Sequence, residues 1–530
     1  MVLFLWLFAA SVLCVCQCQE LDFPPGFQFG VGSSSYQVEG GWNVSDKAES
    51  IWDRYILENP DGIRNRSTGK MACNSYRLWQ RDIDMVAEMG LDFYRFSISW
   101  PRILPTGFSN RISEDGKNYY NNLINGLLEK GIQPVVTIYH WDLPQRLQNL
   151  GGWTNPLIAD WFVDYARVLF TLYGDRVKTW HTINEPWIIC DFGYVFLPPA
   201  ISDYAVGRLL CNKHVLLAHA KAWRLYDTEF RPKYNGQIAI VNQLTWIEPA
   251  GQGDEDIAEL AFQDTIGRYT YPIFSKEGGW PQRIQKIIAK KSKEEGYDFS
   301  RLPDFTQEEV ELIRGTYDFF GMNHYTSRIV RKRRNDETIH TYILQGSREL
   351  EIVFETRPEW KNTSSVWFKE FPQGFRRILQ WVKRSFGDIK IYVTENGYAS
   401  DSSSLEDYNR ISYLRSYLEQ MLLAIKEDGI NVLGYTVWTL MDNFEWIDGY
   451  HSKFGLYYVN FECPNRTRTP RLSAKYYASV AKSHSLNIPD QDKYIVDKSC
   501  CIFSIYTFIP RLFGNGLTTA LNEAIILMHL

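Results

Sequence analysis

Two glutamates stand at the ends of apolar segments and have the chemistry to cleave an acetal bond together. Glu185 directly follows the segment VKTWHTIN, and Glu395 ends the later segment IKIYVTE. Acetal cleavage needs one protonated carboxyl group to protonate the departing oxygen and one ionised carboxylate to meet the anomeric carbon. Two glutamates about 5–5.5 Å apart would give the two-step route that retains the anomeric configuration. The alternative for a single buried glutamate is a structural ion pair with an arginine such as Arg95.

Other polar and aromatic side chains also stand where apolar segments end. A strand end with only a structural role more often carries Gly, Ser or Asp. Here most ends present amide, carboxylate, guanidinium, imidazole or indole groups, so the pattern indicates a functional site. For Glu39 a structural role is favoured, and core packing is the alternative for His140 and Trp438. The strand-end candidates are Gln37, Arg95, His140, Asn184, Asn323, Tyr325 and Trp438, with Glu445 and Trp446 in the loop after the last strand.

The elements that must position these residues alternate regularly along the chain. The candidate strands are residues 27–32, 93–100, 134–141, 177–184, 237–246, 317–325, 389–396 and 432–440. The candidate helices are residues 75–89, 117–130, 157–173, 205–228, 255–269, 374–386, 407–428 and 473–483, and the long segment 278–370 is interpreted as loop insertions. Eight strand–helix units with continuously apolar strands predict an α/β protein with a single (β/α)8 TIM barrel. A doubly wound open sheet is the alternative. In a barrel the carboxyl ends of all strands meet on one face, where the active site forms.

Composition excludes several classes of function. The 530 residues carry 57 Lys+Arg and 62 Asp+Glu, for a net charge of −5. A chain this close to neutral has no electrostatic footprint for nucleic acid or anionic lipid. No ligand cluster or C-x-x-C pair indicates a metal, and the carboxylate pair needs no cofactor, so none is predicted. No apolar run beyond the N-terminus is long enough for a membrane anchor.

The two ends of the chain differ from the body. Residues 2–16 are predominantly apolar and the chain turns polar at Gln17, which predicts a signal peptide over 1–18. Secretion, with a digestive lumen as one destination, is further indicated by N-x-S/T sequons at Asn43, Asn65, Asn362 and Asn465. The barrel is expected over 19–488. The apolar tail 489–530 is atypical, and we hypothesise that it is dispensable.

Two cysteines of the body, Cys190 and Cys211, have two alternative states. They form either one disulfide near the surface or two buried free thiols. The sequence alone does not choose between these states.

Ordered motifs give the chain a specific resemblance. TINEP and VTENG, together with FGVGSSSYQVEG, FYRFSISWPRILP, YHWDLP, GGWTN and WTLMDNFEW, resemble the glycoside hydrolase family 1 β-glycosidases. The likeness spans roughly residues 23–486 and is greatest to secreted animal members, the lactase-phlorizin-hydrolase-like and insect digestive β-glucosidase or myrosinase type. It implies a retaining β-glycosidase that removes terminal β-D-glucosyl residues, with β-galactosides and β-fucosides as further candidate substrates.

The resemblance also implies roles for individual residues. Glu185 matches the acid/base, Glu395 matches the nucleophile, and Arg95 matches a group that supports the nucleophile. The matches to the substrate-binding pocket are Gln37, His140, Asn184, Asn323, Tyr325, Trp438, Glu445 and Trp446. A carboxylate at Glu445 would also repel a sugar 6-phosphate.

Two other classes of protein share this pattern. A non-catalytic, klotho-like binding scaffold usually lacks one of the two glutamates, whereas Glu185 and Glu395 are both present here. A transglycosylase would share every residue and differ in how well its acceptor site excludes water. Glu185 favours an O-glucosidase without excluding a thioglucosidase. Aglycone preference is expected to depend on the loops 191–203 and 335–361, and the oligomeric state is left open.

Overall fold

A computed structural model describes residues 21–339, 345–488 and 494. One compact unit ends at Leu486, and a second unit, from Asn487 onward, lies almost wholly outside the described residues. The predicted signal peptide 1–18 also lies outside them, and so does the predicted tail 489–530 apart from residue 494.

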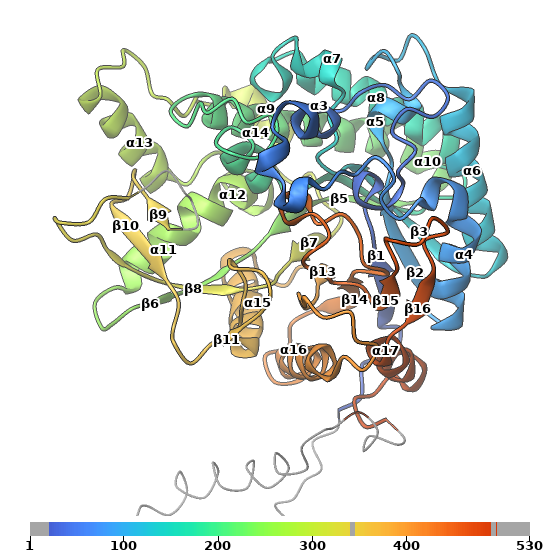
Figure 1. Ribbon diagram of the computed structural model, residues 1–530. Helices are drawn as coiled ribbons and strands as arrows, with labels where there is room; N and C mark the ends of the chain where they lie inside the picture. The colour runs from blue at the N-terminus through green and yellow to red at the C-terminus, as the bar shows by residue number, and fades with distance from the viewer. Residues whose placement is uncertain (1–20, 340–344, 489–493, 495–530) are drawn as a thin grey trace, which may run out of the picture. The chain divides into compact units, whose positions relative to one another are not determined.

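Eight parallel strands close into a barrel, which confirms the predicted fold class and excludes the open sheet (Figure 1). Each strand is short and almost fully buried, because side chains fill the barrel on one face and helices cover the other. In barrel order the strands are β1 (Gln28–Gly32), β14 (Val432–Trp438), β13 (Ile391–Asn396), β7 (Phe320–Asn323), β5 (Gln237–Gln243), β4 (Thr179–Asn184), β3 (Gln133–Tyr139) and β2 (Phe93–Ser97). All eight predicted strands are therefore confirmed, with ends that shift by a few residues.

The helices that surround the barrel present apolar faces to it (Figure 1). In α15, Phe375, Ile378, Leu379 and Val382 recur at helical spacing and are buried, so this face packs inward. The main surrounding helices are α4 (Ser75–Glu88), α6 (Glu114–Glu129), α8 (Ile158–Tyr173), α9 (Gly207–Leu225), α11 (Glu255–Phe262), α12 (Arg268–Phe274), α15 (Pro372–Phe386), α16 (Tyr408–Lys426) and α17 (Leu472–Ser483). No helix among the described residues is both long enough and apolar enough to cross a bilayer.

The predicted loop segment 278–370 is more ordered than expected. Besides β7 it contains two further helices, and it supplies three strands of a small sheet that lies beside the barrel (Figure 1). The helices are α13 (Gln282–Glu294) and α14 (Gln307–Ile313), and the sheet runs β6 (Trp246–Pro249), β8 (Ser327–Lys332), β10 (Ile352–Glu355) and β9 (Gly346–Ser347). The predicted strand 237–246 is correspondingly split between β5 and β6. Short strands without a long alternating pattern gave no clear signal in the sequence.

Short elements complete the described chain. The remaining helices are α2 (Ser35–Val38), α3 (Ile51–Glu58), α5 (Trp100–Ile103), α7 (Gln145–Gln148) and α10 (Arg231–Tyr234). The π-helical turns are η4 (Ile188–Phe192), η5 (Tyr226–Phe230) and η6 (Gln263–Gly267), and the 3₁₀ turns are η1 (Pro60–Gly62), η2 (Arg64–Arg66), η3 (Gly152–Thr154) and η7 (Trp446–Asp448). Two further strand pairs are β11 (Lys361–Asn362) with β12 (Lys369–Glu370), and β15 (Tyr457–Val459) with β16 (Arg468–Pro470).

Candidate active site

Glu185 and Glu395 both line one cavity of about 360 Å³ at the carboxyl ends of the strands. Each follows or ends a strand whose pairing is irregular: the register between β4 and β5 shifts before Asn184, and that between β13 and β7 shifts before Glu395. Such irregularities re-aim side chains next to active sites. Glu185 also has a positive φ of 52°, an uncommon and strained state for a residue other than glycine.

Glu395 is held by two donors. Arg95 donates from Nη1 to Glu395 Oε1 at 2.5 Å, and the Tyr325 hydroxyl donates to Glu395 Oε2 at 2.8 Å. Each carboxylate oxygen of Glu395 thus has a buried hydrogen-bond donor, and one of the two donors carries a positive charge. The sequence left open that a buried glutamate serves only as the structural partner of an arginine. Arg95 does pair with Glu395, but the same cavity also contains the carboxyl group of Glu185.

Glu185 has a different environment. Its Oε1 accepts a hydrogen bond from Asn323 Nδ2 at 2.8 Å, and no ion pair to Glu185 occurs among the described residues. Burial, and to a lesser extent the charge of Glu395, raise the pKa of Glu185 to about 8. Near neutral pH this environment therefore favours the protonated form of Glu185, with burial as the larger cause.

Four of the predicted residues are packed around the cavity, and three of them, Arg95, Asn184 and Asn323, join Glu395 and Glu185 into one network. Asn184 Oδ1 accepts from Arg95 Nη2 at 2.7 Å and from Asn323 Nδ2 at 3.1 Å. Gln37 Nε2 lies 3.3 Å from Glu445 Oε2 and also donates to the Phe444 carbonyl at 3.0 Å. The four residues Gln37, Arg95, Asn184 and Asn323 are fully buried, and this packing makes the geometry around both glutamates rigid.

The remaining predicted residues line one end of the cavity. The His140 ring stacks on Trp438 with centroids 5.7 Å apart, and Trp446 lies 4.5 Å from Trp141. Burial and the neighbouring Arg95 lower the pKa of His140, so its ring is neutral. At this end of the cavity, aromatic rings form the wall and the polar groups of His140 and Glu445 lie next to them.

Glu445 departs from one expectation. Burial, Asp448 and Glu395 raise the pKa of Glu445 well above its ordinary value, which favours the neutral carboxyl form. The expected charge repulsion of a sugar 6-phosphate by an ionised Glu445 is therefore not supported by this environment.

Two other expectations concern structural residues. Glu39 accepts from Arg102 Nε at 2.8 Å and from the Tyr120 hydroxyl at 2.5 Å, which confirms its structural role. Cys190 and Cys211 form a disulfide, as the first of their two alternative states predicted, but both cysteines are fully buried, so the expected place near the surface is wrong.

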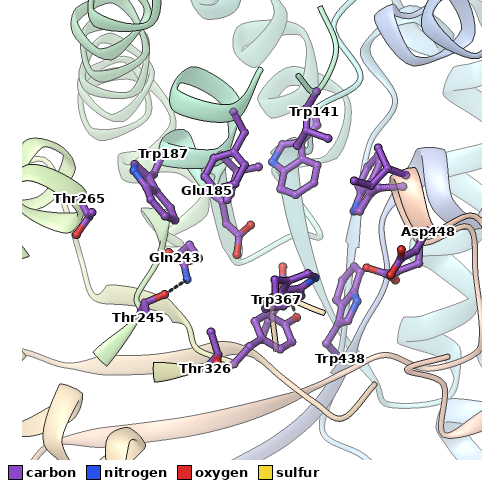
Figure 2. A pocket seen from close by; sticks show the side chains of 18 of the residues that line it. Trp141, Glu185, Trp187, Gln243, Thr245, Thr265, Thr326, Trp367, Trp438 and Asp448 are labelled. Atoms are coloured by element: carbon purple, nitrogen blue, oxygen red, sulfur yellow. Dashed lines mark hydrogen bonds between the residues drawn. The ribbon is translucent and has the colours of Figure 1, made fainter. Parts of the chain in front are cut away.

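The opposite end of the cavity was missed by sequence reasoning, apart from the expectation that loops 191–203 and 335–361 shape it. In Figure 2, Trp187, Gln243 and Thr245 lie on one side of Glu185, and Trp438 and Asp448 lie on the other. Trp187 directly follows the motif TINEP and was detectable for that reason. Gln243 ends the barrel strand β5 and was detectable as a polar strand end, whereas Thr245 lies in the short connection to β6, where no pattern marks it.

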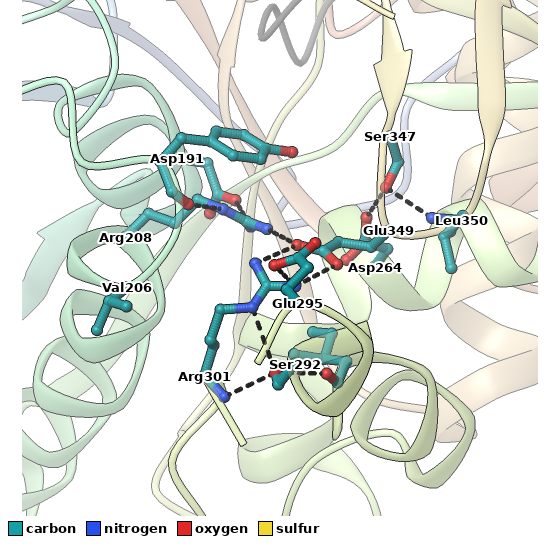
Figure 3. A network of polar contacts seen from close by, with 12 residues as sticks. Asp191, Val206, Arg208, Asp264, Ser292, Glu295, Arg301, Ser347, Glu349 and Leu350 are labelled. Carbon is teal, nitrogen blue, oxygen red and sulfur yellow. Dashed lines mark hydrogen bonds and ion pairs between the residues drawn. The ribbon is translucent and has the colours of Figure 1, made fainter. Parts of the chain in front are cut away.

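A buried charge network supports this end of the cavity. Asp191 binds Arg208 at 2.9 Å and Arg268 at 2.7 Å, and Glu349 binds Arg208 at 3.0 Å and Arg301 at 2.9 Å (Figure 3). The network connects the π-turns η4 and η6 with helix α9 and the segment after β9. Since η4 and η6 supply Ile188, Phe192, Thr265 and Ile266 to the cavity lining, the network fixes the position of that wall. No group of three or more potential metal-ligand side chains occurs in the described part of the chain.

The sequence profile of Glycosyl hydrolase family 1 matches residues 19–486. Myrosinase 1 of Brevicoryne brassicae is 43% identical over 470 residues, which cover 88% of this chain and 99% of that protein. The cytosolic beta-glucosidase of Homo sapiens is 38% identical over 472 residues, which cover 88% of this chain and 99% of that protein. The solved structure of aphid myrosinase superposes with a TM-score of 0.83 at 42% identity, covering 88% of this chain and all of that one. The chain therefore belongs to glycosyl hydrolase family 1 and is a glycosyl hydrolase.

Proposed function

We propose that this enzyme removes terminal β-D-glucosyl residues from O-glycosides with retention of configuration, with Glu395 as nucleophile and Glu185 as acid/base. The observation that carries the proposal is that two glutamates of one cavity have opposite environments. Glu395 is bound by Arg95 and Tyr325, whereas Glu185 contacts a neutral amide and has a raised pKa.

The reaction proceeds in two displacements. Glu395 attacks the anomeric carbon while the bond to the leaving oxygen breaks, and Glu185 gives its proton to that oxygen. Formation of the glycosyl ester removes the negative charge of Glu395, so the pKa of Glu185 falls. Glu185 then takes a proton from water, which attacks the anomeric carbon and releases Glu395.

The glucosyl unit occupies the end of the cavity that is lined by aromatic rings. Trp438 and Trp446 stack on its C–H surface, and His140 and Glu445 bind its hydroxyl groups. Asn184 binds the 2-hydroxyl, a contact that strengthens as positive charge develops on the ring. Gln37 and Asn323 act from behind, where they already bond Glu445 and Glu185.

The test is hydrolysis of 4-nitrophenyl β-D-glucoside by the wild type, Glu395→Gln and Glu185→Ala, with the product anomer followed by NMR. We expect β-glucose first, loss of turnover in Glu395→Gln, and a loss of about 10²–10⁴-fold in Glu185→Ala that azide partly rescues. An α-anomer product, or full activity in Glu395→Gln, contradicts the assignment.

A thioglucosidase is the second candidate, favoured by the similarity to Myrosinase 1. A sulfur leaving group departs without acid help, so kcat/KM for a 1-thio-β-glucoside, which reports formation of the glycosyl ester, would be insensitive to Glu185→Ala. Hydrolysis of the ester would still lose its base. Comparing kcat/KM for the O- and S-glucosides in the wild type and in Glu185→Ala separates the two functions.

We also propose that the mature protein is a secreted glycoprotein. Asn43, Asn65, Asn362 and Asn465 are all exposed, and Cys190 pairs with Cys211 in a disulfide, a bond typical of oxidising compartments. The human relative is named a cytosolic enzyme, so the compartment differs among proteins of this similarity.

A further inference from the structure

One buried arginine differs from all the others among the described residues. Nine arginines are buried, and eight of them form an ion pair with a carboxylate: Arg95, Arg102, Arg208, Arg268, Arg301, Arg410, Arg468 and Arg471. The ninth, Arg328, is 7% exposed and has no such partner in the described part of the chain. A buried charge without a counter-ion is costly, so its retention calls for a functional explanation.

Arg328 lines the same cavity and pairs in the small sheet with Ile247, two residues after Thr245, which lies at the end of the cavity opposite Trp438 and Asp448. It lies two residues after Thr326, which also lines the cavity, whereas the intervening Ser327 does not. This alternation continues into strand β8, and Tyr325, which binds Glu395, also lines the cavity just before that strand. A ligand whose sugar reaches Glu395 can therefore extend along this strand towards Arg328.

The contacts of Arg328 leave donors for a ligand. Nη1 donates to Thr326 Oγ1 at 3.2 Å and to the Ser327 carbonyl at 2.8 Å, and Nη2 donates to the Trp367 carbonyl at 2.5 Å. All three acceptors are neutral, and a guanidinium has five N–H donors. Burial without a nearby charge lowers the pKa of Arg328 to about 10, so it is still a cation at neutral pH.

The surroundings define the rest of the ligand. The walls near Arg328 are apolar and include Trp187, Phe192, Ile247, Phe354 and Trp367, and Val366 at the same end is 97% exposed. Among the described residues that line the cavity, Arg328 is the only Arg or Lys. This end thus combines a large apolar surface with a single positive charge.

We propose that this end of the cavity is a binding site for a hydrophobic aglycone that carries an anionic group, a carboxylate or sulfate, which pairs with Arg328. The inference rests on the proposed function and specifies its substrate class. The guanidinium fork suits two oxygens of one oxyanion, and the apolar walls hold the remainder of the aglycone.

The test measures affinity, so leaving-group chemistry does not enter. Isothermal titration calorimetry in the Glu395→Gln background compares 4-carboxyphenyl β-D-glucoside with its neutral counterpart, 4-carbamoylphenyl β-D-glucoside. We expect the anionic glucoside to bind about tenfold more tightly, with a preference that decreases at high salt. Adding Arg328→Gln should reduce the preference to about one, and Arg328→Lys should retain part of it.

A matched control removes one positive charge from the surface. Arg384 is exposed on α15 and does not line the cavity, so Arg384→Gln should keep the full preference. Equal binding of both glucosides by the unaltered Arg328 protein overturns the inference, even if the Arg328 variants do not fold. If Arg328→Gln weakens the binding of both glucosides equally, the inference is also overturned. That result would mean that Arg328 acts only structurally, through its hydrogen bond to the Trp367 carbonyl.

The hydrolysis assay and the titration test the proposed function and the role of Arg328 separately. If the wild type does not hydrolyse 4-nitrophenyl β-D-glucoside, that function is wrong. The titration still reports whether Arg328 selects an anion, because it needs no turnover.

Discussion

At the scale of residues, identical side chains acquire opposite properties from their neighbours. Glu395 faces a guanidinium and a phenol, both of which stabilise its charge, while Glu185 faces an amide in a buried position. The pKa of Glu185 rises to about 8 because its charged form loses hydration and lies near Glu395. One residue type can therefore serve as both acid and nucleophile.

This environment predicts the alkaline side of the pH profile. Glu185 must be protonated to act as acid, so kcat/KM for 4-nitrophenyl β-D-glucoside should fall as the pH rises through about 8. The measurement is the pH dependence of initial rates. In Glu185→Ala with 2,4-dinitrophenyl β-D-glucoside, whose leaving group needs no acid, the alkaline fall should be absent. Its persistence there would assign the fall to another group.

At the scale of elements, the barrel supplies the catalytic groups and the insertions supply the shape of the cavity. Strands β4 and β13 end at Asn184 and just beyond Glu395, whereas the turns η4 and η6 and the segment after β9 form the opposite wall and its support. The loop after Glu395 packs against β14 because Gly397 has no side chain: a Cβ there would overlap the Trp438 carbonyl. The two parts of the site thus have different structural origins.

The buried network predicts a large effect at Glu349. Glu349→Gln leaves Arg208 and Arg301 with less negative charge around them, and breaking a buried pair costs about 3–5 kcal/mol of the free energy of unfolding. Glu295, whose side chain is 49% exposed, also pairs with Arg301, and Glu295→Gln should cost less than about 1 kcal/mol. Urea unfolding of both variants measures the difference. Similar losses in the two variants would show that Glu349 has no special structural role.

In the folded Glu349→Gln variant, we further expect KM for aryl glucosides to rise more than kcat falls. The network supports the aglycone wall and does not contact Glu185 or Glu395, so binding is affected more than chemistry.

At the scale of the whole molecule, the asparagines of the four sequons are all exposed, and none of them is among the residues that line the cavity: Asn43, Asn65, Asn362 and Asn465.

Expression in insect cells should give a secreted protein with up to four N-glycans. Each Asn→Gln change should remove one step in electrophoretic mobility, and all the variants should collapse to one mobility after enzymatic deglycosylation. Retention of an unglycosylated protein inside the cells would contradict secretion.

The barrel unit and the family match both end at residue 486, which predicts that the following residues are not needed for catalysis. A chain ending at residue 488 should be secreted and should hydrolyse 4-nitrophenyl β-D-glucoside with a kcat/KM within about twofold of that of the full chain. Loss of secretion or of activity on removal of 489–530 would show that the tail is required.

The sequence by itself determined the barrel and pointed to Glu185 and Glu395 as the proposed catalytic pair, whereas the tertiary structure decided how the surrounding charges and loops come together. Continuous apolar strands and the motifs TINEP and VTENG are local signals, and a closed parallel barrel places every strand end on one face. Local signals do not reveal which charges meet. The resemblance placed Arg95 beside Glu395, but it revealed neither the network around Asp191 and Glu349 nor the buried Arg328, which has no ion-pair partner among the described residues. Both depend on segments that are far apart in the sequence. The end of the cavity opposite the proposed glucosyl site was not predicted for the same reason, because irregular loops and short strands come together only when the chain folds.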